Sequence, residues 1–154
     1  MANEISSSAL NDLLHQYVLV EWQASPTATP NRYVLTFAHH VLFDYTVARL
    51  LLRNPDRLVE SLQNDPDLAL TIRPSLGYRF QTAWWSDSAR QQFWDLVLQV
   101  SRVDSIPEIG KLIGATVAAD LADRISDFAP VLRALGDTAP EYKEAAERTV
   151  GHVV

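Results

Sequence analysis

The chain has 154 residues, of which 47% are hydrophobic and 21% charged, so it is long and apolar enough for one compact domain or two small ones. The absence of cysteine excludes disulfides, thiolate catalysis and cysteine-based zinc or iron–sulfur sites. With a formal net charge of −6, a nucleic-acid-binding surface would have to be a local basic patch. The sequence has no HExxH or EF-hand spacing, no apolar run of 18 residues and no signal-peptide core, so we expect a cytoplasmic protein with no metal, cofactor or membrane contact.

Residues 1–38 carry the pattern of a helix followed by a β-hairpin. The serines at positions 6–8 are suitable N-caps, and apolar residues at helical spacing predict a helix over Ser8–Tyr17. Runs of β-branched and aromatic residues predict strands over 18–22 and 33–37, joined by a polar loop. A helix followed by a hairpin forms the closing half of a winged-helix unit, so we assign residues 1–38 to a partial unit of this kind.

Residues 39–154 predict a helical bundle or a stack of irregular helical repeats. Residues 39–53 are apolar around most of the helix circumference, which is typical of a buried helix. Asn54-Pro55 starts the next helix, and Asp87 or Ser86 is the predicted N-cap of a later one. The predicted fold class is therefore mainly α, with a short N-terminal hairpin and six or seven helices after it.

Two features of the C-terminal half concern packing. Gly110 and Gly114 lie one helical turn apart, which allows another helix to approach closely. The acidic residues between positions 120 and 147 predict a solvated helix face, with Glu144 and Arg148 at the spacing of an ion pair.

The segment from Phe37 to Tyr45 contains His-His-x-x-x-Asp directly after a predicted strand. This motif resembles the acyltransferase signature of peptide-synthetase condensation domains, which implies His40 as general base and Asp44 as its structural partner. Tyr45 stands where that family has glycine, its second motif is absent, and its two lobes need a much longer chain. This enzyme is the alternative function, and it requires an accessible His40.

The same segment, extended to Leu52, resembles STAND-class NTPases of the NACHT kind, at the point where the winged-helix domain ends and the helical repeats begin. The residues that fit this pattern are Phe37, His39, Asp44, Tyr45, Ala48 and Arg49. The resemblance covers about residues 8–53, and under this interpretation one of the two adjacent histidines is buried.

The resemblance implies a non-catalytic regulatory, sensor or scaffold segment rather than a complete NTPase. No GxxxxGK[ST] loop occurs, since Gly110-Lys111 is followed by Leu112 and lacks the upstream glycine. The nucleotide-binding domain is therefore missing from this chain. The implied partners are a protein or other domains of a larger signalling protein.

A winged helix can also bind DNA, but the residues of the first predicted helix argue against it. Glu4 and Asp12 lie in or near that helix, and the first basic residue of the chain is Arg32. A surface without lysine or arginine cannot neutralise phosphates, so we expect no nucleic-acid partner.

The region richest in aromatic residues lies between positions 73 and 94. Because tryptophan and arginine dominate binding hot spots, its candidates for a protein-interaction surface are Arg73, Arg79, Trp84 and Trp85. The alternative is that these aromatics form the core between helices, with Phe80, Trp94 and one of the adjacent tryptophans inside and the other near the surface.

Overall fold

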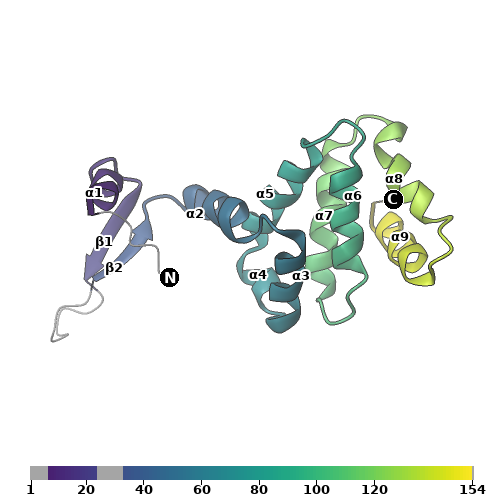
Figure 1. Cartoon of the computed structure of the whole chain (residues 1–154), viewed down its shortest axis with the longest axis horizontal. Helices are drawn as coiled ribbons and strands as arrows, with labels where there is room; N and C mark the ends of the chain where they lie inside the picture. Colours follow the sequence, from purple (N-terminus) through teal and green to yellow (C-terminus); the bar gives the residue numbers. More distant parts are fainter. Residues whose placement is uncertain (1–6, 24–32, 154) are drawn as a thin grey trace. The chain divides into compact units, whose positions relative to one another are not determined.

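The computed structural model describes residues 7–23 and 33–153. Their fold is mainly α with one two-stranded antiparallel sheet near the N-terminus, which confirms the predicted fold class (Figure 1). The elements, in chain order, are α1 (Ser7–His15), β1 (Leu19–Gln23), β2 (Tyr33–Phe37), α2 (His40–Thr46), the π-helix η1 (Val47–Leu51), α3 (Pro55–Asn64), α4 (Leu68–Thr71), α5 (Arg73–Trp84), α6 (Gln91–Ser101), α7 (Glu108–Leu121), the 3-10 helix η2 (Ile125–Phe128), α8 (Ala129–Ala134) and α9 (Pro140–Val153).

The chain divides into two compact units, Met1–Phe43 and Asp44–Val154, which are described separately. Within the described ranges, no helix has the length and apolar character needed to cross a membrane. The same ranges contain no group of three His, Asp or Glu side chains placed to hold a metal ion.

The first unit contains α1 and the hairpin. Helix α1 ends two residues earlier than predicted because Tyr17 adopts a left-handed conformation with φ of 55°. The N–H of Val18 donates to the Leu13 carbonyl (3.0 Å) and that of Tyr17 to Leu14 (3.1 Å), which is the Schellman pattern of helix termination.

The two strands pair in the register Leu19 opposite Phe37, and Trp22 donates its indole N–H to the Thr36 hydroxyl (3.0 Å). The predicted cap at Ser6 and the predicted loop, including Arg32, lie outside the described residues. Every described side chain of this unit is at least partly exposed.

The hydrophobic core lies in the second unit. Its largest fully buried side chains come from α3, α5, α6, α8 and the turn before α7: Leu58, Leu62, Leu76, Phe80, Trp84, Phe93, Trp94, Leu96, Val97, Val100, Ile106 and Val131. At its centre, Phe93 makes edge-to-face contacts with Phe80, Trp84 and Trp94, at ring distances of 6.1, 4.9 and 5.0 Å. Each such pair adds about 0.5–1.5 kcal/mol beyond the burial of its area.

The prediction of one buried helix over residues 39–53 is wrong. The segment forms α2 and then the π-helix η1, and α2 contains no buried residue. Among the residues of η1, Leu50 and Leu51 are 73% and 67% exposed, whereas Val47 is buried. An apolar circumference makes burial favourable, but only the face that meets another element is removed from water.

Proline positions define the next helix starts, as the sequence predicts. Asn54 caps α3 by accepting hydrogen bonds from the backbone N–H groups of Asp56 (2.9 Å) and Arg57 (3.2 Å), with Pro55 in the first turn. Pro74 lies in the first turn of α5 and separates it from α4.

The bend between α5 and α6 is built around Arg90. This residue has a φ of 58°, in the left-handed region, and its guanidinium lies over the rings of Trp84 (4.7 Å) and Trp85 (5.3 Å). The same guanidinium donates to the Trp84 carbonyl (2.8 Å) and to the carboxylate of Asp127 (3.2 Å). Arg90 therefore connects the end of α5 to η2.

The prediction of a wholly solvated acidic face is wrong at Asp127, because only 7% of this residue is exposed. Its second carboxylate oxygen accepts from the backbone N–H groups of Asp123 (3.3 Å) and Arg124 (3.2 Å), and its carbonyl accepts from the Trp94 indole (2.7 Å). The predicted Glu144–Arg148 pair is present at 3.5 Å on α9.

Candidate functional site

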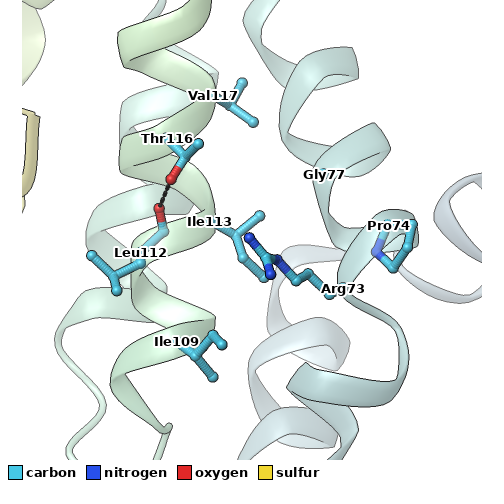
Figure 2. Close-up of a pocket in the computed structure, with 8 residues that line it drawn as sticks. All are labelled: Arg73, Pro74, Gly77, Ile109, Leu112, Ile113, Thr116 and Val117. Carbon is cyan, nitrogen blue, oxygen red and sulfur yellow. Dashed lines mark hydrogen bonds between the residues drawn. The ribbon is translucent and has the colours of Figure 1, made fainter.

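A groove of about 550 Å³ lies in the second unit between α5 and α7. Figure 2 shows its lining: Arg73, Pro74 and Gly77 from α5, with Ile109, Leu112, Ile113, Thr116 and Val117 from α7.

Residue spacing on the two helices explains the groove. Ile109, Ile113 and Val117 follow one another at intervals of four, so they form one apolar stripe along α7. On the facing helix, Gly77 has no side chain, and a Cβ atom there would meet nothing within 4 Å. The groove is the space that a larger residue at position 77 would fill.

The polar groups of the lining leave the wall of the groove apolar. Thr116 donates its hydroxyl hydrogen to the Leu112 carbonyl (3.0 Å), so this hydrogen is used within α7 (Figure 2). Arg73 extends from the start of α5 toward Ile113 (Figure 2), and no carboxylate of the described residues pairs with its guanidinium. This arrangement suits an apolar helix face that carries one carboxylate.

The four residues predicted to form an interaction surface do not lie together in the structure. Arg73 lines the groove, and Trp85 is 64% exposed at the end of α5. Trp84 is fully buried, so its prediction as an interaction residue is wrong, whereas the alternative of one tryptophan inside and one near the surface is confirmed. Arg79 is half-buried and donates to the carbonyls of Leu52 (2.8 Å) and Arg53 (3.3 Å).

The motif residues of the first unit are at the end of the hairpin. Phe37 makes an edge-to-face contact with Phe43 at 6.1 Å. His39 and His40 are both exposed, so the prediction that one of the pair is buried is wrong. Both precede or begin α2, where the His39 carbonyl accepts from the N–H of Leu42 (3.0 Å), and neither ring is needed to fill a core.

The remaining motif residues belong to the second unit. The Asp44 carboxylate accepts a hydrogen bond from the Ser75 hydroxyl at 2.7 Å, and Ser75 is fully buried. Tyr45 and Arg49 are exposed. This hydrogen bond connects Asp44 to the start of α5 within the second unit.

The α7 side of the groove is not predictable from the sequence. The stripe of Ile109, Ile113 and Val117 is visible in the sequence, but it has the same spacing as an ordinary core face. The only distinguishing signal is Gly77 in the middle of a predicted helix, and its meaning depends on which helix faces it.

Comparisons with family models, with curated proteins and with solved structures find no significant match to this chain.

Proposed function

We propose that the chain is a non-catalytic regulatory, sensor or scaffold segment that acts through contacts with a protein partner or with other domains. The observation that carries this proposal is the apolar α5–α7 groove with the unpaired Arg73 at its edge. The sequence pattern from Phe37 to Arg49 supports the more specific proposal of a segment that resembles part of a STAND signalling NTPase.

The occupant that fits the groove best is an amphipathic helix. In helix-in-groove recognition the bound helix places apolar side chains, spaced three and four residues apart, into an apolar groove. Ile109, Ile113 and Val117 provide the apolar lining here, and Ile113 and Val117 are held in place as part of the core. A carboxylate on the rim of that helix would pair with Arg73, and such a charged rim contact mainly sets orientation and association rate.

A peptide selection tests this proposal. Helical peptides selected from a random library on the full chain are expected to share an apolar stripe and an acidic residue, and to bind in a fluorescence-anisotropy titration. Gly77→Leu fills the groove and should abolish this binding. Gly151→Leu in α9 is the matched control, because position 151 is equally open. Selected peptides that bind Gly77→Leu as tightly as the original chain would contradict the proposal.

A second candidate is the acyltransferase-like enzyme, which is favoured by one observation, the exposure of His40. A thermal melt with acyl-CoA separates the two functions, because a ligand that binds only the folded chain at a hundredfold excess over its Kd adds about 2.7 kcal/mol of stability. A rise in midpoint that disappears in His40→Ala would favour the enzyme. An unchanged midpoint with acyl-CoA would favour the regulatory segment. The same melt is repeated with Mg-ATP, and a rise in its midpoint would reveal a nucleotide site without a P-loop.

A further inference from the structure

A smaller pocket of about 210 Å³ lies elsewhere in the second unit, around the end of η1. Its lining residues are Ala48, Arg49, Arg53, Arg79, Thr82, Ala83, Ser86 and Gln92. Three arginines therefore meet at one pocket of a chain whose formal net charge is −6.

The local backbone explains why these arginines meet. Arg49 lies in the π-helix η1, a wide-turn element that is frequent at functional sites, and Arg53 lies two residues after the end of η1. Arg79 reaches this point from α5, and its bonds to the carbonyls of Leu52 (2.8 Å) and Arg53 (3.3 Å) fix its guanidinium in place. The chain thus holds one arginine rigidly and places two exposed arginines beside it.

The positive charge of this pocket lacks a partner within the described residues. None of the pocket-lining residues is acidic, and no carboxylate pairs with Arg49, Arg53 or Arg79 in the described ranges. Asp87, the neighbour of Ser86, does not line the pocket, and its carboxylate accepts from the backbone N–H groups of Gln91 (3.2 Å) and Gln92 (3.1 Å). Burial lowers the pKa of the Arg79 guanidinium, as expected for a cation without a counter-ion.

The free donors suit a tetrahedral oxyanion. Two of the five N–H groups of Arg79 are used by the two carbonyls, which leaves three. Thr82 and Ser86 already donate their hydroxyl hydrogens to the carbonyls of Tyr78 (2.8 Å) and Ala83 (2.6 Å), so the guanidinium groups and the Gln92 amide remain. Arginine donors match phosphate oxygens in pairs, and such charge-assisted bonds are stronger than neutral ones.

We propose that Arg49, Arg53 and Arg79 form a binding site for a phosphate dianion, either free or carried on a small organic group. The site is separate from the apolar α5–α7 groove and does not depend on the function proposed for that groove.

Calorimetric titration of the full chain tests this site, with inorganic phosphate and phosphoserine as probes in a phosphate-free buffer of fixed ionic strength. Binding of phosphate would identify the free anion as sufficient, and binding of phosphoserine alone would identify a phosphate monoester. Arg49→Gln and Arg53→Gln should each weaken binding by about tenfold or more, since each removes a charge-assisted contact from an exposed position.

Arg57→Gln is the matched control, because Arg57 is an exposed arginine of the next helix that does not line this pocket. It removes the same charge and should leave the affinity within about twofold of the original. The proposal would be overturned if neither probe bound. It would also be overturned if sodium chloride at equal ionic strength displaced the probes completely, since binding would then not be selective for phosphate. A third contrary result would be that Arg57→Gln weakens binding as much as Arg49→Gln.

Discussion

Arg90 performs three tasks that normally fall to different residues. It turns the chain in a left-handed conformation, it covers the rings of two adjacent tryptophans, and it neutralises the buried Asp127. A residue with a side chain is strained by about 1–2 kcal/mol in that conformation, which glycine avoids. The side-chain contacts must outweigh this strain.

Two substitutions separate the strain at Arg90 from its contacts. We expect Arg90→Ala to lower the free energy of unfolding by about 2–4 kcal/mol, because Asp127 then loses its cation in a buried site. Arg90→Gly should lower it by about 1 kcal/mol less, the reverse of the usual order in helices. Urea unfolding measures both. Equal losses would mean that the left-handed conformation is not retained. Arg57→Ala is the control for removing an exposed arginine, and it should change the free energy of unfolding by less than about 0.5 kcal/mol.

Asp87 makes a pH-dependent contribution to the stability of the folded state. Burial alone would raise its pKa. The hydrogen bonds from the backbone N–H groups of Gln92, Gln91, Ala89 and Arg90 lower it by more than burial raises it, so the pKa of Asp87 lies below the ordinary value of 3.8. A depressed carboxyl pKa stabilises the folded state above the unfolded pKa, and this stability disappears as the pH falls through the folded pKa.

We therefore expect Asp87→Ala to lower the free energy of unfolding by about 1 kcal/mol near pH 7, as for the loss of a helix N-cap. The difference from the original chain should begin to shrink below about pH 4, where Asp87 of the unfolded chain becomes protonated, and should disappear as the pH falls through the lower pKa of the folded chain. Urea unfolding across this pH range measures it. The N-cap position of α6 is Arg90 and not Asp87 or Ser86 as predicted, but the Asp87 carboxylate still accepts from the first two N–H groups of the helix. A difference that stays constant through the acid range would contradict this role of the charged carboxylate.

At the scale of elements, α7 is held close to its neighbours by Gly114. A Cβ atom at this position would lie 2.7 Å from Val97 Cγ2 and 3.2 Å from Phe80 Cε1. Both neighbours are fully buried, so neither can move away easily. At Gly114 the predicted close approach therefore brings α7 against both α5 and α6. Gly110 makes its close approach to α4 instead, where an added Cβ atom would lie 3.1 Å from Ala69 Cβ.

A series of glycine-to-alanine substitutions tests this packing. Gly114→Ala should lower the free energy of unfolding by about 1–3 kcal/mol because of overpacking, despite alanine's better helix propensity. Gly77→Ala, which meets open space, should instead raise it by about 0.5–1 kcal/mol. Chemical denaturation compares the two, and the same sign for both would contradict the packing described.

Elements with a local cause are predictable from the sequence. Strand β2 has the bounds predicted for it, and Asn54-Pro55 starts a helix as predicted, because strand propensity and capping depend on neighbouring residues. The burial of residues 39–53 is not predictable in this way, since it depends on which elements arrive from elsewhere. The π-helix also changes the phase of the side chains within that segment.

The residues of the candidate site are also predictable only in so far as they depend on local sequence. The sequence identifies Arg73 and Arg79 as polar residues in an aromatic region, but it cannot place them at two different pockets. That separation arises because α5 faces α7 along one side and the end of η1 along another. Trp84 illustrates the converse, since a residue type common in interfaces is equally common in cores.

At the scale of the whole molecule, the stabilising apolar contacts are concentrated in the second unit. The described core cluster runs from Val47 to Ala146 and includes no residue of the first unit. A two-stranded hairpin is marginally stable in water unless it packs against another element, and no described side chain of the first unit is buried. The two units should therefore differ strongly in their resistance to unfolding.

We expect a chain that begins at His39 to fold and to unfold cooperatively. Its thermal midpoint should lie within about 3 °C of that of the full chain, because no core residue has been removed. Calorimetry measures this midpoint, and hydrogen exchange on the full chain should show faster exchange for the β1 and β2 amides than for α6. A large fall in the midpoint would mean that the first unit contributes to the core.

The placement of the tryptophans makes the two units optically distinguishable. Trp84 and Trp94 are fully buried, whereas Trp22 of the first unit and Trp85 of the second are 63% and 64% exposed. A soluble quencher such as acrylamide will therefore remove the emission of one pair and leave that of the other. In Trp85→Phe the quenchable emission comes from Trp22 alone, so the fluorescence of an unlabelled chain follows the first unit while the protected signal follows the core.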